Sequence, residues 1–179
     1  MRTITRIVTT AGAALAGCAL AGALASAQIP APNTGPQSSD QDFINQAMAA
    51  GIAEVREGQL ALQKSHNAAI RAFANQMIAD HAAGNTQLAA IADQKGLKYP
   101  TTVDAQEAAS LSHLRSLSGT AFDRAYAQEQ VPDHQQAIAL FQKETGDSGG
   151  DLDIRATAGN LLPTLQHHLQ MAQALAGSK

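Results

Sequence analysis

Three histidines and one glutamate occupy positions from which they could bind a metal ion. On a helical wheel, His81 falls at the centre of an apolar stripe formed by Ile70, Met77 and Leu88. An imidazole nitrogen is a common ligand of zinc, copper and iron. His81 is therefore expected to face the interior of a helical protein, where a metal ion could satisfy it.

Two further histidines face inward on their own predicted helices. His168 shares a helical face with Leu161 and Leu165, whereas its neighbour His167 points to the opposite side. His134 lies near Phe141 on a broader apolar stripe. His66 and His113 fall in connections and are expected to be solvated.

Glu54 borders the apolar face of the first predicted helix, while Glu57 is expected to point further away. Gly58 on this helix would let another helix or a ligand come close. Each of four helices then offers one ligand: Glu54, His81, His134 and His168. Three imidazoles and one carboxylate suit a single divalent ion of zinc, copper or iron.

A competing interpretation needs no metal. A single core histidine is usually satisfied by a carboxylate, a carbonyl or a water, and Glu54 could be such a partner. Three histidines favour a metal, because each unpaired buried imidazole costs roughly 1 to 3 kcal/mol and one cation can satisfy several. Asp80 and Asp133 directly precede histidines and are expected to accept hydrogen bonds or to be surface charges.

Enzymatic motifs are missing from the sequence. No Glu is followed three residues later by His, as the helical di-iron motif requires. The chain also has no Gly-rich phosphate loop, no nucleophile elbow and no cysteine after the predicted export signal. We predict no catalytic residues; a structural or partner-binding bundle is the alternative to a metal-binding one.

Four long helices are expected to position the candidate ligands. Apolar residues at helical spacing, with capping residues such as Asn67, predict helices over residues 39–65, 67–96, 120–144 and 152–176. Residues 96–118 form a long connection with a short helix, which can travel the roughly 37 Å length of a 25-residue helix. This predicts an all-α four-helix bundle with a crossover between helices two and three, as in ferritin-like proteins. The alternative is a plain up-down-up-down bundle, with the connection packed across one end.

Pro132 lies inside the third predicted helix. Proline lacks an N–H group and crowds the carbonyl of the preceding turn. A kink next to His134 is expected, or a break between two shorter helices.

Residues 1–27 have the pattern of an export signal. Arg2 and Arg6 precede an apolar stretch that ends at a small-residue cleavage site, Ala25 to Ala27. The alternative is a lipoprotein box at residues 15–18, "LAGC", which would anchor the protein through Cys18. Both predict an exported, periplasmic protein whose contact with the membrane is limited to the signal or the lipid anchor.

The segment that follows the signal should be a tether. Residues 28–38 contain three prolines and no charge, which is typical of a flexible linker before a domain at residues 39–176. Removing the signal reduces the 12 Lys and Arg to 10, against 15 Asp and Glu, a formal charge of −5. This charge argues against a nucleic-acid partner, and the sequence identifies no protein partner.

Three stretches together resemble a known family of exported bacterial proteins. They are "DFINQAMAAGIAEVREGQLALQKSHNAAIRAFANQMIADHAAGN", "SGTAFDRAYAQEQVPDHQQAIALFQKE" and "LLPTLQHHLQMAQAL". This series is similar to the DUF4142 family, a ferritin-like domain of unknown function. The resemblance implies a ferritin-like four-helix bundle without established activity. Its recurrent motifs fall on Glu54, Asp80, His81, Asp133, His134 and His168.

Overall fold

The computed structural model describes residues 36–177, which form five helices and no strands. The prediction of an all-helical protein is confirmed for these residues. The predicted export signal, the box at Cys18 and residues 28–35 of the tether lie outside the described range. The helices are α1 (Pro36–Lys64), α2 (Ala68–Lys95), α3 (Ala105–Ser116), α4 (Gly119–Gly146) and α5 (Leu152–Gly177).

The boundaries of α2 are set by the residues that the sequence indicates. The side chain of Asn67 accepts hydrogen bonds from the backbone N–H groups of Ala69 and Ile70. Gly96 ends the helix with φ 68°, a left-handed conformation that glycine adopts without strain. Local chemistry therefore explains both ends of this helix.

One predicted boundary was wrong. Helix α1 begins at Pro36 rather than Ser39, so residues 36–38 belong to the helix and not to the tether. Proline fits the first turn of a helix because the N–H that it lacks would have no partner there. Pro132 lies inside α4, which is continuous from Gly119 to Gly146, so the alternative of a break between two shorter helices is wrong, whereas the kink next to His134 stays a prediction.

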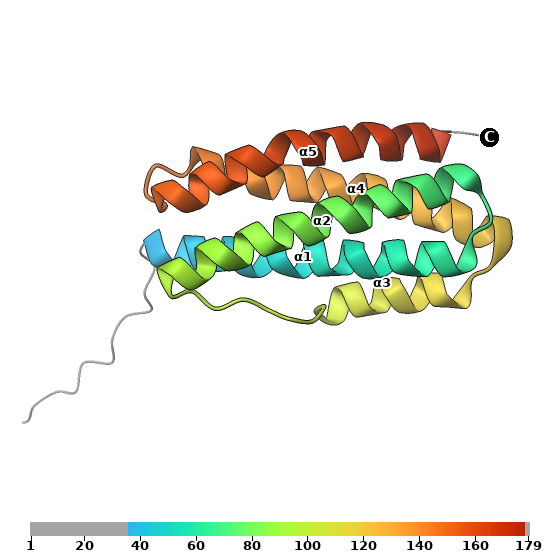
Figure 1. Cartoon of the computed structure of the whole chain (residues 1–179), viewed down its shortest axis with the longest axis horizontal. Coiled ribbons are helices and arrows are strands. Elements are labelled where there is room, and N and C mark those ends of the chain that lie inside the picture. Colours follow the sequence, from blue (N-terminus) through green and yellow to red (C-terminus); the bar gives the residue numbers. More distant parts are fainter. Residues whose placement is uncertain (1–35, 178–179) are drawn as a thin grey trace, which may run out of the picture. The chain divides into compact units, whose positions relative to one another are not determined.

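The long helices pack as two hairpins, α1 with α2 and α4 with α5. In addition, α1 contacts α4 and α2 contacts α5. Figure 1 shows that the connection after α2 runs back along the bundle, with α3 beside α1, so that α4 runs in the same direction as α2. The connection does not pack across one end, as the up-down-up-down alternative requires.

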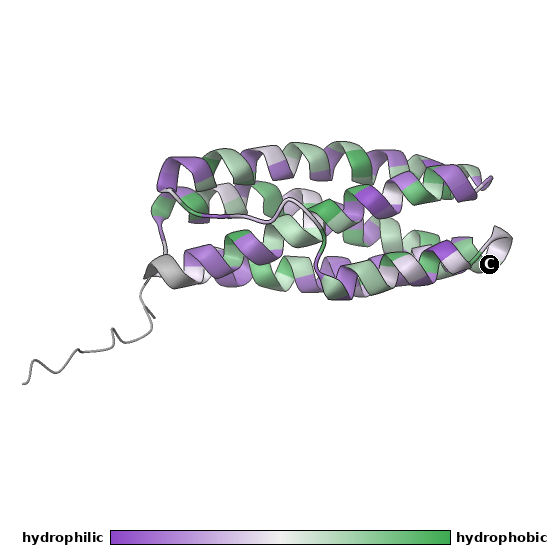
Figure 2. Ribbon diagram, turned by 90° about the horizontal axis from the view of Figure 1, so that it is seen from below, coloured by the Kyte–Doolittle hydropathy of each residue, from purple (hydrophilic) through white to green (hydrophobic). Residues whose placement is uncertain are grey.

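The apolar core has two clusters, and a layer of polar residues lies between them along each long helix. One cluster includes Phe73, Met77 and Leu114, and the other includes Ile44 and Leu88. Along α2, for example, His81 falls between the segment 70–77 of the first cluster and the segment 88–92 of the second. Figure 2 shows hydrophobic and hydrophilic residues alternating along the helices.

This polar layer holds buried residues from three helices. They are Glu54 and Glu57 on α1, Gln130 and His134 on α4, and His168 on α5. No helix within residues 36–177 combines the length and the hydropathy needed to cross a membrane.

Candidate metal site

Three of the four predicted ligands come together in the centre of the bundle. The rings of His81, His134 and His168 come from α2, α4 and α5, and their centroids are 5.2 to 5.6 Å apart. Each ring offers one nitrogen, and these three nitrogens all lie within 4.8 Å of one another. His134 and His168 are almost fully buried.

The ring of His134 is fixed by its own helix. Its Nδ1 is 2.9 Å from the backbone carbonyl oxygen of Gln130, one turn earlier. A carbonyl can only accept, so Nδ1 carries the hydrogen and Nε2 of the neutral ring has a free lone pair. Burial lowers the pKa of His134 to about 4, although the bond to Gln130 opposes this shift. His134 Nε2 is buried and has no hydrogen-bond partner among the described residues.

His168 is fixed by a carboxylate from another helix. Its Nε2 is 2.8 Å from Oδ2 of Asp80 on α2. Burial raises the pKa of Asp80, but hydrogen bonds from Gln76 and His168 outweigh it, and the net pKa is lowered. The ionised carboxylate accepts from Nε2, so Nδ1 of the neutral His168 ring has the lone pair. This Nδ1 is also buried and unpartnered within residues 36–177.

His81 faces the other two imidazoles. Burial, together with repulsion from His134 and His168, lowers its pKa to about 3, so the ring is neutral at pH 7. Its Nε2 is buried without a hydrogen-bond partner in the part of the chain that the structure describes. Each of the three rings therefore has one buried nitrogen that no group in the described part of the chain satisfies.

The fourth predicted ligand, Glu54, lies in a neighbouring group. One oxygen each of Glu54, Glu57 and Asp133 lies within 4.8 Å of the other two. Glu54 Oε1 is 3.7 Å from His134 Nδ1, the nitrogen that donates to the backbone carbonyl of Gln130. Glu54 therefore approaches the His134 ring from the side of Nδ1 and not from the side of Nε2. His134 thus lies between the three-histidine group and the carboxylate group.

The expectation that Glu57 points away was wrong. It is only 2% exposed, accepting hydrogen bonds from Gln130 Nε2 at 3.0 Å and from Ser110 Oγ at 3.3 Å. Ser110 belongs to α3, so the crossover helix covers the side of α1 that carries Glu57. If only the four long helices are considered, a helical wheel of α1 places that side of the helix in solvent.

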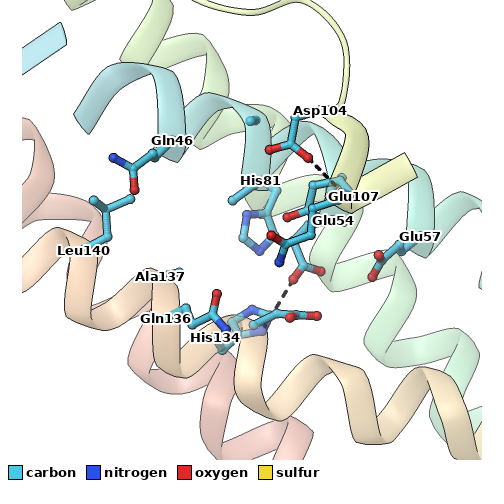
Figure 3. A pocket seen from close by; sticks show the side chains of 15 residues that line it. Gln46, Glu54, Glu57, His81, Asp104, Glu107, His134, Gln136, Ala137 and Leu140 are labelled. Atoms are coloured by element: carbon cyan, nitrogen blue, oxygen red, sulfur yellow. Dashed lines mark hydrogen bonds and ion pairs between the residues drawn. The ribbon is translucent and has the colours of Figure 1, made fainter. Parts of the chain in front are cut away.

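A cavity of about 220 Å³ is lined by the three carboxylates and by two of the three histidines, His81 and His134. Figure 3 shows Glu54, His81 and His134 gathered at one end of it, with Gln46 and Leu140 at the other. Burial and repulsion between neighbouring carboxyl groups raise the pKa of Glu57 to about 8 and that of Asp133 to about 7. The pKa of Glu54 is also raised well above its usual value, by burial first and then by Glu57.

Comparison with known proteins identifies the family. The family described as Domain of unknown function (DUF4142) matches residues 25–175. The chain belongs to the DUF4142 family. The chain is also similar to a solved structure titled "Crystal structure of DUF305 fragment from Deinococcus radiodurans", with 13% identity and a TM-score of 0.69 over 80% of this chain and 98% of that one. At this identity, the likeness concerns the fold alone. The comparison with curated proteins gives no match.

In this DUF4142 protein, sequence reasoning found the histidines and missed part of the carboxylate group. Glu54 and Glu57 are three residues apart and so lie on one side of α1, a spacing that could have indicated a shared environment. Asp133, predicted to be an acceptor or a surface charge, lies half-buried in the carboxylate group, which the sequence analysis does not anticipate. Asp80 is the hydrogen-bond acceptor that was expected, although its partner is His168 rather than the adjacent His81.

Proposed function

We propose that this protein is an exported, ferritin-like helical bundle that binds one divalent metal ion through His81, His134 and His168. The parallel course of α2 and α4 around a long crossover supports the ferritin-like assignment. The signal pattern of residues 1–27 supports export, with a lipid anchor at Cys18 as the alternative. Metal binding or stress protection in the periplasm is the role that this combination favours.

One observation carries the proposal: three neutral imidazoles each have a buried nitrogen without a partner among residues 36–177. Each such nitrogen costs roughly 1 to 3 kcal/mol when it is left unsatisfied. A cation satisfies all three at once. Nitrogens on one tetrahedral ion are about 3.4 Å apart, so binding would draw the rings slightly together.

The chemistry of the ligands limits the choice of ion. Imidazole nitrogens suit zinc, copper and iron, whereas magnesium and calcium prefer oxygen. The hydrogen bonds of His134 to Gln130 and of His168 to Asp80 orient the rings, as the outer hydrogen bonds of metal-binding histidines commonly do. Glu54 is not needed as a ligand in this arrangement.

The proposal is tested by elemental analysis of protein purified without a histidine tag or a chelator. We expect about one zinc, copper or iron ion per chain, and its loss in the His81→Ala/His168→Ala variant. Asp80→Asn should retain the ligands but bind the ion about 10- to 100-fold more weakly, because the carboxylate that orients His168 is lost.

A matched control removes two histidines outside the site. His66 and His113 are exposed, and the His66→Ala/His113→Ala variant should bind the ion as the wild type does. If the folded wild-type protein binds none of the three metals even when each is added, the three histidines are not a metal site and the protein is a structural or partner-binding bundle.

A further inference from the structure

The carboxylate group beside the histidines has its own chemistry. We propose that Glu54, Glu57 and Asp133 form a second cation site, selective for a divalent ion that prefers oxygen ligands. One carboxylate oxygen of each lies within 4.8 Å of the others, and none of the three belongs to the three-histidine group. The second site therefore does not depend on the metal site proposed above.

Glu54 and Glu57 are buried and Asp133 is half-buried, and no lysine or arginine among the described residues pairs with them. Glu54 is 6% exposed and Glu57 is 2% exposed. Within residues 36–177, neither these two nor Asp133 forms a salt bridge with a lysine or an arginine. Burying like charges side by side is unfavourable unless protons or a cation neutralise them. A divalent ion would do so and would hold the three side chains in one place.

Unpartnered oxygens at the same place provide an independent indication of a ligand. The amide nitrogen of Gln130 donates to Glu57 Oε2 at 3.0 Å, which fixes the amide beside the carboxylates. Its oxygen, Oε1, is buried and has no partner among the described residues, and the same holds for Glu54 Oε2. A neutral amide oxygen beside carboxylate oxygens is a typical ligand combination for hard cations.

The surroundings admit and attract a hydrated ion. Glu54, Glu57 and Asp133 all line the cavity of about 220 Å³, which has room for several waters of about 30 Å³ each. Asp104 and Glu107, at the start of α3, line the same cavity and add negative potential to it. Hard cations retain waters in their coordination shell, so three protein carboxylates are a sufficient anchor.

Manganese(II) is the probe that best separates this site from the imidazole site. Carboxylate ligands suit Mn²⁺, and among the divalent first-row metals it binds nitrogen ligands most weakly. Electron paramagnetic resonance measures free aqueous Mn²⁺ directly during a titration. We expect about one Mn²⁺ to bind per chain, both in the wild type and in the His81→Ala/His168→Ala variant.

The Glu57→Gln/Asp133→Asn variant is the decisive one. It conserves side-chain shape, and it relieves repulsion in the apoprotein, so it should fold, as circular dichroism can verify. We expect its dissociation constant for Mn²⁺ to rise at least about tenfold. The Asp42→Asn/Asp93→Asn variant removes the same charge from exposed positions and should bind Mn²⁺ like the wild type.

Three results would overturn the second site. The first is a folded wild-type protein that binds no Mn²⁺. The second is equal Mn²⁺ affinity in the wild type and in Glu57→Gln/Asp133→Asn. The third is loss of Mn²⁺ in the histidine variant with retention in the carboxylate variant, which would assign the ion to the imidazoles. Failure of zinc, copper or iron to bind would leave this result unaffected.

Discussion

His134 and His168 are held in opposite tautomers by different acceptors. A backbone carbonyl fixes the hydrogen of His134 on Nδ1, and the Asp80 carboxylate fixes that of His168 on Nε2. In each ring, the nitrogen without an acceptor is also buried. Rings that are already oriented and neutral need neither deprotonation nor large movements to bind an ion, which favours affinity.

The buried carboxyl groups make the metal-free protein sensitive to pH. The pKa of Glu57 is raised to about 8, so the folded state retains a proton that the unfolded chain releases near pH 4.5. The stability that this proton provides is complete below pH 4.5 and is lost as the pH rises through 8. His81 and His134 have lowered pKa values, so their effect arises below pH 6.5, where falling pH destabilises the fold.

We therefore predict that the free energy of unfolding of the metal-free protein falls between pH 6.5 and 8.5. Glu57 should account for about 1 to 2 kcal/mol of this decrease, and Glu57→Gln should remove that part. Urea denaturation in the presence of a chelator at pH 6.5, 7.5 and 8.5 measures it. Asp93→Asn, at an exposed position, should keep the wild-type slope. Equal slopes for Glu57→Gln and the wild type would contradict the prediction.

The residues of the site differ in how far sequence could predict them. A histidine inside a stripe of Ile, Met and Leu is conspicuous, because the stripe itself identifies the buried face. Glu57 has no such mark, since its burial depends on Ser110 of α3, which is 53 residues away in sequence. Contacts made by a crossover are set by tertiary packing, and a wheel for a single helix cannot contain them.

At the scale of elements, α1 and α2 approach closely at Gly58. A Cβ atom at this position would be 2.8 Å from Cγ1 of Ile78 and 3.0 Å from the backbone oxygen of Ala74. Gly84, by contrast, has room, because a Cβ there would lie 3.7 Å from Leu161. Both glycines are buried within helices. Substituting each one by alanine therefore distinguishes the effect of close packing from the effect of helix propensity.

We predict opposite effects of alanine at these two positions. Gly84→Ala should stabilise the protein by up to about 1 kcal/mol, since alanine favours the helix. Gly58→Ala should destabilise it by about 1 to 3 kcal/mol, because α1 and α2 must move apart. Thermal or chemical denaturation of the two variants measures the difference. A Gly58→Ala variant as stable as Gly84→Ala would show that the contact between α1 and α2 is loose.

Helix existence was easier to predict than helix limits. Asn67 and Gly96 mark the ends of α2 through local hydrogen bonds and backbone conformation, which the sequence displays directly. Pro132 does not end α4, because a proline penalty of about 3 kcal/mol is smaller than what a long helix gains from packing. The direction of α4 depends on the path of the connection, which runs along α1. Short-range sequence patterns do not determine this path.

At the scale of the whole molecule, the three histidines lie where the two hairpins of the bundle meet. His81 comes from the α1–α2 hairpin, and His134 and His168 come from the α4–α5 hairpin. The polar layer interrupts the apolar core at this level, so hydrophobic packing holds the hairpins together on either side of it. An ion bound here would act as a link between hairpins at the level where the apolar core is interrupted.

Metal binding should therefore raise the thermal stability of the whole bundle. Zinc at about 100 times its dissociation constant should stabilise the native state by about 2.7 kcal/mol. For a chain of this size, this corresponds to a rise in Tm of about 5 to 10 °C. Differential scanning calorimetry of the wild type with zinc and with chelator measures the shift. His66→Ala/His113→Ala should show the same rise, and His81→Ala/His168→Ala should show almost none. An equal rise in all three proteins would mean that zinc acts outside the three-histidine site, and that the link between hairpins through these histidines does not form.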